Sequence, residues 1–240
     1  MTLTLTVPPR TDADRLTGLP VAVIGAGPVG LAAAAHLLER GLDVVVYEAG
    51  PTVGTSVRAW GHTRLFSPWQ YVIDPAAQRL LEATGWEAPR AASLPTGQDL
   101  VDTYLAPLAA TPQLAPVIRY GTRVEAVSRQ GMDRTRSTGR ADTPFLLRLH
   151  TADGVTDITA RAVVDTSGTY TSPNPLTAAG LAPAADLGDR VVHALPDVLG
   201  ADRARFSGKR VLVVGAGHSA ANTLIKLASL AKTAPGTEVL

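Results

Sequence analysis

The sequence contains no cysteine among its 240 residues. Disulfide bonds, thiolate catalysis and cysteine-ligated metal centres are therefore excluded from these residues, and a lack of disulfides is what we expect of a cytoplasmic protein. An excess of one charge is also absent, because 22 Lys and Arg residues are balanced by 21 Asp and Glu residues. A net charge of +1 gives no reason to expect nucleic acid or an anionic membrane as a partner.

A signal peptide and a membrane span are also not indicated. Residues 1–18 lack the basic-then-apolar layout of a secretion signal, and we interpret them as a flexible tail. The uncharged run over residues 19–38 has the length of a membrane span, but it contains a glycine turn and Pro28, which would interrupt a single helix. The five histidines are scattered without metal-ligand spacing, so we predict no metal site.

The segment over residues 21–48 predicts a β-strand–helix–β-strand unit. Residues 21–24 and 44–47 are short apolar runs, as expected for parallel strands buried on both faces. Residues 28–40 between them are rich in alanine and leucine and predict a helix. The stretch GAGPVG, residues 25–30, joins the first strand to this helix.

This glycine-rich stretch predicts a dinucleotide site. Gly25 allows a tight turn, Gly27 lets a pyrophosphate approach the backbone, and Gly30 lets the helix pack against the strand. Pro28 opens the helix, whose N-terminus offers free amides to phosphate. Glu48 ends the second strand, where it can accept hydrogen bonds from a ribose diol and would repel a 2′-phosphate. The site therefore suits FAD or NAD, with a purely structural glycine turn as the alternative.

The middle of the chain predicts two helices and a small antiparallel sheet. Asp74 before Pro75, and Thr96 three residues before Asp99, are typical helix starts. We expect these helices to run to about residues 84 and 110, respectively. Turn-rich segments then separate the expected strands of this sheet at residues 123–129, 145–151 and 155–159, and residues 161–165 are expected to form one more apolar strand.

The stretch KRVLVVGAGHSAAN, residues 209–222, repeats the strand–glycine turn–helix plan. We expect a strand over residues 209–214, a helix over 219–231 and the start of another strand at 237–240. Ala220 stands in place of the third glycine, and the hydroxyl of Ser219 can donate to phosphate or cap the helix. The cofactor-binding candidates of this second turn are Gly215, Gly217, His218, Ser219 and Ala220.

A hydrolase nucleophile is the competing interpretation of this second turn, because G-H-S-A-A around Ser219 is close to the G-x-S-x-G elbow. Hydrolases of that kind place their acid and histidine after the serine. No histidine follows Ser219, Glu238 is the only acid that does, and Ala221 stands where the last glycine should be. We therefore reject the hydrolase in favour of the dinucleotide site.

With both motifs in place, the chain resembles the flavoproteins that have two dinucleotide-binding domains, in particular the flavin-containing monooxygenase-like branch. The resemblance is carried by the two glycine motifs and Glu48, by TSG at residues 166–168 in place of the family's A-T-G, and by Pro173 and Pro175. The segment WGHTRLFSPWQYVIDPAAQRLL, residues 60–81, also resembles flavin monooxygenases associated with arsenic-resistance operons.

The resemblance implies an α/β fold. A Rossmann-like FAD-binding domain with an antiparallel meander would span residues 19–172, and residues 173–240 would begin a Rossmann-like NAD(P)H-binding domain. The ADP half of FAD would lie at the first glycine motif and Glu48, with the backbone of Val124 near the adenine. Thr166, Ser167 and Gly168 would pass close to the cofactor, unless they form a plain strand-end turn. Arg58 and Trp60 would approach the pyrophosphate and flavin, or else be a solvated arginine and a core tryptophan.

The implied function is an oxidoreductase in which NAD(P)H reduces FAD and the reduced flavin activates oxygen for a small-molecule substrate. We name no catalytic side chain, and the lack of cysteine excludes the relatives that use a cysteine pair. The residue that separates NADH from NADPH would fall about three positions after Leu240, so we expect a truncated chain. Two alternatives remain open: a non-catalytic nucleotide-binding remnant, and a flavin-dependent reductase or oxidase without oxygenation. Homo-oligomer formation is also left open.

Overall fold

The computed structural model describes residues 15–181, 184–193 and 195–240, which fall into two compact units. The first unit comprises residues 15–55, 73–88 and 104–167, and the second comprises residues 56–72, 89–103 and the described residues from 168 onwards. The expected N-terminal tail lies outside the described residues up to residue 14. The domain boundary at residue 172 stays a prediction.

A parallel sheet forms the centre of the first unit, with the strand order β3-β2-β1-β7. Its strands are β1 (Val21–Ile24), β2 (Val44–Tyr47), β3 (Ile118–Arg119) and β7 (Ala162–Asp165). The first three residues of β1 are at most 4% exposed, as expected for a central strand covered on both faces. Helix α1 (Pro28–Glu39) connects β1 to β2, which confirms the predicted β-strand–helix–β-strand unit.

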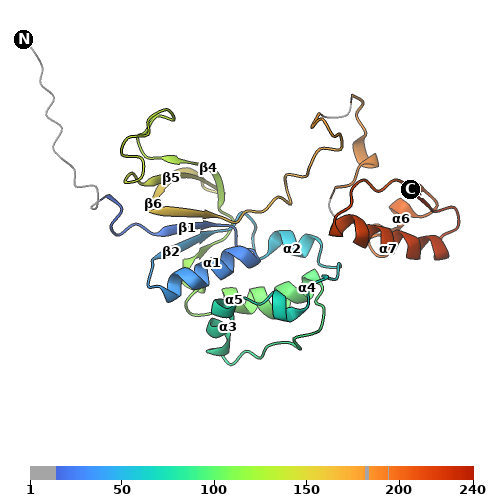
Figure 1. The fold of residues 1–240 in the computed structure, drawn as a ribbon, viewed down its shortest axis with the longest axis horizontal. Helices are drawn as coiled ribbons and strands as arrows, with labels where there is room; N and C mark the ends of the chain where they lie inside the picture. Colours follow the sequence, from blue (N-terminus) through green and yellow to red (C-terminus); the bar gives the residue numbers. More distant parts are fainter. Residues whose placement is uncertain (1–14, 182–183, 194) are drawn as a thin grey trace, which may run out of the picture. The chain divides into compact units, whose positions relative to one another are not determined.

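The antiparallel meander covers one face of this sheet. It consists of β4 (Arg123–Arg129), β5 (Phe145–Thr151) and β6 (Gly154–Ala160). Leu147, Leu149 and Ala160 of the meander form one buried cluster with Ala22 and Tyr47 of the parallel sheet. Figure 1 shows β4, β5 and β6 on one side of β1 and β2, with α1 on the other side. The first unit is therefore an α/β structure with a parallel sheet and an antiparallel meander, as predicted.

Both predicted helix starts of the middle segment are confirmed. Asp74 caps α3 (Pro75–Glu82), because its Oδ1 accepts two backbone amides of the first turn at 2.9 and 3.1 Å. Thr96 and Asp99 form a complete capping box at α4 (Gly97–Asp99), with N–O distances of 3.0 and 2.9 Å. These local side-chain bonds satisfy amides that have no partner inside the helix.

The predicted helix from this capping box to about residue 110 is confirmed in extent, but its middle is not α-helical. After α4 the helical hydrogen-bonding pattern changes to that of a π-helix in η3 (Leu100–Leu105). It returns to the α-helical pattern in α5 (Ala106–Ala109). Pro107 explains the change, since it has no amide hydrogen and its ring clashes with the carbonyl four residues earlier. The wider π-helical turn accommodates the proline while keeping Leu105 and Leu108 fully buried.

The remaining helical segments are short. They are α2 (Thr55–Ala59), α6 (Arg203–Phe206) and the 3₁₀ turns η2 (Trp69–Tyr71), η4 (Ala115–Val117) and η5 (Gly188–Arg190). No helix within the described ranges has both the length and the apolar character that crossing a membrane requires.

The later part of the second unit repeats the strand–turn–helix plan on a smaller scale. Strands β8 (Arg210–Val211) and β9 (Glu238–Val239) pair in parallel, and α7 (His218–Thr233) packs on them. The predicted strand over residues 209–214 is wrong in length, because it ends at Val211. Among the described residues β8 pairs with β9 alone, and that pairing covers two residues. Leu212 and Val214 are 68% and 62% exposed as a result.

We predict that Asp74→Ala lowers the free energy of unfolding by about 1 kcal/mol, the usual effect of losing a helix N-cap. The variant removes both amide bonds at the start of α3 and the 3.0 Å contact between Asp74 Oδ2 and His36 Nε2. Glu82→Ala is the matched control, since this carboxylate lies at the other end of the same helix and accepts a hydrogen bond from the exposed Gln78 side chain at 2.7 Å. Urea unfolding of both variants measures the effect, and equal midpoints would contradict the capping role.

Candidate functional site

The first glycine turn is built by a close approach of three backbone segments. Gly25 has a φ of +98°, which favours glycine. A Cβ on Gly30 would lie 1.9 Å from the carbonyl oxygen of Gly25 and 2.7 Å from Thr166 Oγ1. The Thr166 hydroxyl donates to the carbonyl oxygens of Ile24 (2.6 Å) and Gly25 (3.3 Å). Gly30 and Thr166 therefore hold α1 and the end of β7 against the turn.

Gly27 faces open space in contrast to its two neighbouring glycines. A Cβ built on Gly27 would meet no heavy atom within 4 Å among the described residues. Gly27 is also the N-cap of α1, which has neither a side-chain cap bond nor an acidic residue in its first turn. Free backbone donors and the positive end of the helix dipole therefore lie beside the open space, an arrangement that suits phosphate.

Glu48 lies against this turn at the carboxyl end of β2. Its Oε2 accepts the backbone amide of Ala26 at 2.8 Å, and its Oε1 accepts the amide of Gly50 at 2.7 Å. Each carboxylate oxygen can accept a second hydrogen bond. The carboxylate is thus fixed beside Gly25–Gly30 and still able to bind a hydroxyl donor. Its charge also contributes, after burial, to the raised pKa of Tyr120, a neighbour that the sequence analysis missed.

The TSG stretch forms a strand-end turn and also touches the glycine turn. Asp165 Oδ1 accepts the amide of Ser167 at 3.0 Å and its hydroxyl at 2.7 Å, and Gly168 has a φ of +69°. The hydrogen bond from the Ser167 amide is the main reason that the pKa of Asp165 is lowered. The sequence offered a plain strand-end turn and a cofactor contact as alternatives for residues 166–168. Thr166 is compatible with both, because its hydroxyl also contacts Gly25 of the first glycine turn.

The second glycine turn has nearly the same backbone geometry as the first. Gly215 has a φ of +125°, and the N-cap Gly217 has φ −82° and ψ 179°, close to the −86° and −173° of Gly27. A Cβ on Gly217 would again meet nothing within 4 Å among the described residues. Helix α7 likewise has no side-chain cap bond and no acid in its first turn. Ser219 lies within this regular helix, which agrees with the rejection of a nucleophile elbow.

Arg58 and Trp60 belong to the second unit and have different surroundings. Arg58 Nη1 donates to Asp102 Oδ1 at 3.1 Å, whereas its buried Nε has no hydrogen-bond partner among the described residues. Trp60 packs closely on the start of α4, since a Cβ on Gly97 would lie 2.7 Å from Trp60 Cε3 and Cζ3. Trp60 is therefore held in place by packing, and the buried Nε–H of Arg58 is left without an acceptor among the described residues.

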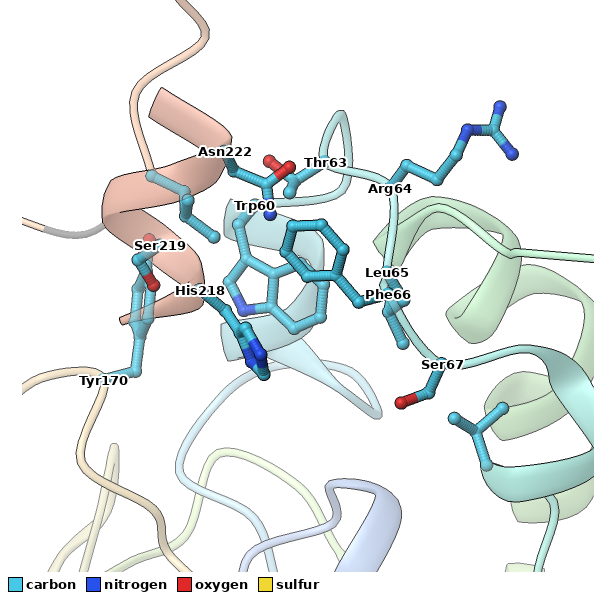
Figure 2. Close-up of a pocket in the computed structure, with 12 residues that line it drawn as sticks. Trp60, Thr63, Arg64, Leu65, Phe66, Ser67, Tyr170, His218, Ser219 and Asn222 are labelled. Atoms are coloured by element: carbon cyan, nitrogen blue, oxygen red, sulfur yellow. The ribbon is translucent and has the colours of Figure 1, made fainter. Parts of the chain in front are cut away.

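A cavity of about 410 Å³ lies in the second unit and brings Trp60 together with the second glycine turn (Figure 2). The segment over residues 60–72 and the first turns of α7 form most of its wall. Phe66 and His218 both line it and pack against each other, with ring centroids 5.0 Å apart. Its lining residues are Trp60, Thr63, Arg64, Leu65, Phe66, Ser67, Val72, Tyr170, Leu195, His218, Ser219 and Asn222.

The structure places the predicted site residues in both units. Those in the first unit are Gly25, Gly27, Pro28, Gly30, Glu48, Val124, Thr166 and Ser167; those in the second are Arg58, Trp60, Gly168, Gly215, Gly217, His218, Ser219 and Ala220. The Val124 side chain packs against the core cluster of the meander, beside a register shift in β4. Sequence reasoning gave no role to Thr63 and Phe66, although they lie in the segment over residues 60–81, and it missed Lys226, which no short motif marks.

Two glycine turns of matching geometry, each opening a helix without a side-chain cap, define an α/β dinucleotide-binding protein. No group of three or more His, Asp or Glu side chains in the described ranges could hold a metal ion. Residues 22–234 match the family model of the pyridine nucleotide-disulphide oxidoreductases. The chain belongs to this family.

Individual relatives agree with this assignment. A ferredoxin–NADP reductase from Saccharopolyspora erythraea is 32% identical over 88% of this chain and 51% of its own length. A flavin-containing monooxygenase of the GS-OX type from Arabidopsis thaliana is 26% identical over 91% of this chain and 49% of its own length. The crystal structure of OTEMO in complex with FAD and NADP is similar, with a TM-score of 0.56 and 23% identity over 92% of this chain and 38% of that one. The chain spans about half the length of these two curated relatives.

We predict that Gly30→Ala lowers the free energy of unfolding by at least about 2 kcal/mol, since its Cβ must displace the Gly25 carbonyl from a packed turn. Gly27→Ala is the matched control, because the same methyl group enters open space and the cost is about 1 kcal/mol or less. Urea unfolding of both variants measures the difference. A Gly30→Ala protein as stable as Gly27→Ala would show that the close approach is not a structural constraint.

We also predict a pH-dependent effect of Asp165→Asn. Because the folded-state pKa of Asp165 is lowered, its charge stabilises the fold fully above the unfolded pKa of about 3.9, and this contribution is lost as the pH falls below that value and through the lower folded-state pKa. The variant should have a lower urea midpoint than wild type at pH 7, and the difference should shrink towards pH 3. A difference that stays constant or grows on acidification would contradict the role of the Ser167 bonds.

Proposed function

We propose that this chain binds FAD at the first glycine turn and NAD(P)H at the second, and that it serves a monooxygenase-type oxidoreductase acting on a small substrate. One observation carries the proposal: a turn with open space at Gly27 has the Glu48 carboxylate fixed at its edge. The names of the relatives support it, since one is a flavin-containing monooxygenase and another an NADP reductase.

The residues of the first turn fit the ADP half of FAD. Gly27 leaves room for the pyrophosphate, and the uncapped N-terminus of α1 supplies donors for it. Glu48 accepts the ribose hydroxyls through its free lone pairs, and its negative charge disfavours a 2′-phosphate there. When bound there, FAD would supply the redox chemistry, accepting electrons from NAD(P)H and passing them to oxygen.

The second turn is proposed to hold the pyrophosphate of NAD(P)H in the same manner. Gly217 is open, the start of α7 is uncapped, and the Ser219 hydroxyl lies at the helix start where it can donate to phosphate. His218 and Ser219 also line the cavity next to Trp60. The second turn would therefore bring the nucleotide to the edge of a cavity large enough for a small molecule.

The unpartnered Nε of Arg58 supports an anion-binding role for this side chain. A buried guanidinium N–H without an acceptor costs on the order of 1–3 kcal/mol, and Arg58 Nε is such a group among the described residues. The Asp102 carboxylate already occupies Nη1. A pyrophosphate oxygen would accept a hydrogen bond from this buried Nε–H, so we keep Arg58 as a proposed cofactor contact.

A reductase or oxidase without oxygenation is the second candidate. The observation that favours it is the 32% identity to the ferredoxin–NADP reductase, which is higher than the 26% identity to the flavin-containing monooxygenase. Both functions need the same two nucleotide sites. They differ in whether oxygen is transferred to a substrate.

Gly27→Ala is expected to weaken FAD binding at least about tenfold, because the added methyl group occupies the space of the pyrophosphate. Gly217→Ala is the matched control, and it should weaken NADPH or NADH binding while leaving FAD binding unchanged. Titration of the purified chain with FAD and with each nicotinamide nucleotide, followed by flavin absorbance and by calorimetry, measures both. A wild-type chain that takes up no FAD would overturn the flavoprotein proposal.

The reaction type is tested by supplying NADPH or NADH, oxygen and methyl phenyl sulfide to the FAD-loaded chain. Formation of the sulfoxide with matching consumption of the nicotinamide nucleotide is the expected result. Hydrogen peroxide as the only oxygen product would instead support the reductase or oxidase. Retained FAD without nicotinamide oxidation would contradict both enzyme functions for this chain.

A further inference from the structure

The cavity in Figure 2 is distinguished by the aromatic rings around it. Aromatic residues make up 5% of the sequence, yet Trp60, Phe66 and Tyr170 all line this one hollow, together with the His218 imidazole. Phe66 and Tyr170 remain 50% and 38% exposed, so their ring surfaces are still available to a ligand. Aromatic faces in such an arrangement favour a flat ring, through stacked or edge-to-face contacts.

The residues that line the cavity include no negatively charged side chain. None of its lining residues is Asp or Glu, and Arg64 is the lining residue that carries a full charge. Figure 2 shows the Arg64 guanidinium directed away from the cavity, so it leaves the aromatic surfaces free. A cationic ligand would therefore find no carboxylate in the wall to pair with.

A second positive charge lies directly behind the wall. Lys226 Nζ donates to Thr63 Oγ1 at 3.2 Å, and Thr63 is only 2% exposed. Lys226 follows Asn222 and His218 at intervals of four residues, so all three lie on the face of α7 that meets the segment over residues 60–67. Burial is the main cause of the lowered pKa of Lys226, with Asp197 acting in the opposite direction. The ammonium group is thus partly desolvated, so water screens its charge less than that of an exposed lysine.

We propose that this cavity binds a flat aromatic ring that carries no positive charge, and that this ring belongs to the organic substrate. The assignment as substrate rests on the proposed oxidoreductase function. The volume of about 410 Å³ lies within the usual range for small-molecule sites. The nicotinamide ring of NAD(P) is also flat and aromatic, so the experiment must distinguish a nicotinamide from an organic substrate.

Benzamide, benzoate and benzamidine test the charge rule, since they share one flat shape and are neutral, negative and positive. Ligand-observed NMR titration of the full chain, without added flavin, should show binding of benzamide and benzoate and roughly tenfold weaker binding of benzamidine. Benzamidine binding as tight as benzamide would overturn the charge rule. A failure of all three to bind would overturn the site itself.

Two pairs of variants assign any binding to this cavity. Phe66→Ala should weaken benzamide binding several-fold, whereas Tyr71→Ala, in the same segment but 75% exposed and outside the cavity lining, should not. Lys226→Met should reduce the discrimination against benzamidine by several-fold, whereas Lys232→Met, an exposed lysine of the same helix, should leave it unchanged. Equal effects within either pair would contradict the assignment.

Saturating NADP⁺ and NAD⁺ identify the source of the ring. Benzamide binding that persists in their presence supports a separate substrate site, and competitive loss of binding would assign the cavity to the nicotinamide instead and overturn the substrate proposal. The outcome is independent of flavin. If the chain binds the ring but takes up no FAD, the ring site is supported and the proposed function is overturned. If the chain takes up FAD but binds no ring, the proposed function is supported and the ring site is overturned.

Discussion

The contact between the backbone of Gly30 and the carbonyl of Gly25 is the constraint on which the first unit depends. It exists only because Gly30 has no side chain, and the Thr166 hydroxyl extends it to the end of β7. One close approach therefore joins a strand end, a turn and a helix start. The remaining side of the turn, at Gly27, is left open, and Glu48 is fixed beside it. Rigid walls around an open backbone are what a pyrophosphate site needs.

The second unit uses the same turn with different support. Gly215 and Gly217 reproduce the dihedral angles of the first copy, but Ala220 stands where Gly30 makes its close contact. Helix α7 is instead held by a small cluster around Leu227 and Leu230 and by the bond from Lys226 to Thr63. The start of α7 thereby faces a cavity as well as a phosphate-sized opening. A nucleotide and a second ligand can meet at one helix terminus in this arrangement.

Sequence reasoning succeeded where the determinant is local. The buried runs of β1 and β2, the caps at Asp74 and Thr96, and the glycine turns are each fixed by a few neighbouring residues. It failed where the outcome depends on competition or on distant partners. Pro107 changes the helical register before α5, and β8 is shorter than its apolar run because its pairing with β9 covers two residues. The cavity joins residues 60–72 to residues 218–222, and no periodic pattern predicts that pairing.

The central claim is that the two glycine turns hold different nucleotides. Hydrogen–deuterium exchange of the 240-residue chain, with FAD and then with NADPH or NADH, tests it most directly. The account predicts that FAD slows exchange of the amides over residues 25–30 and leaves residues 215–220 unchanged, and that the nicotinamide nucleotide protects residues 215–220. Protection of the second turn by FAD, or of neither turn by either nucleotide, would contradict it.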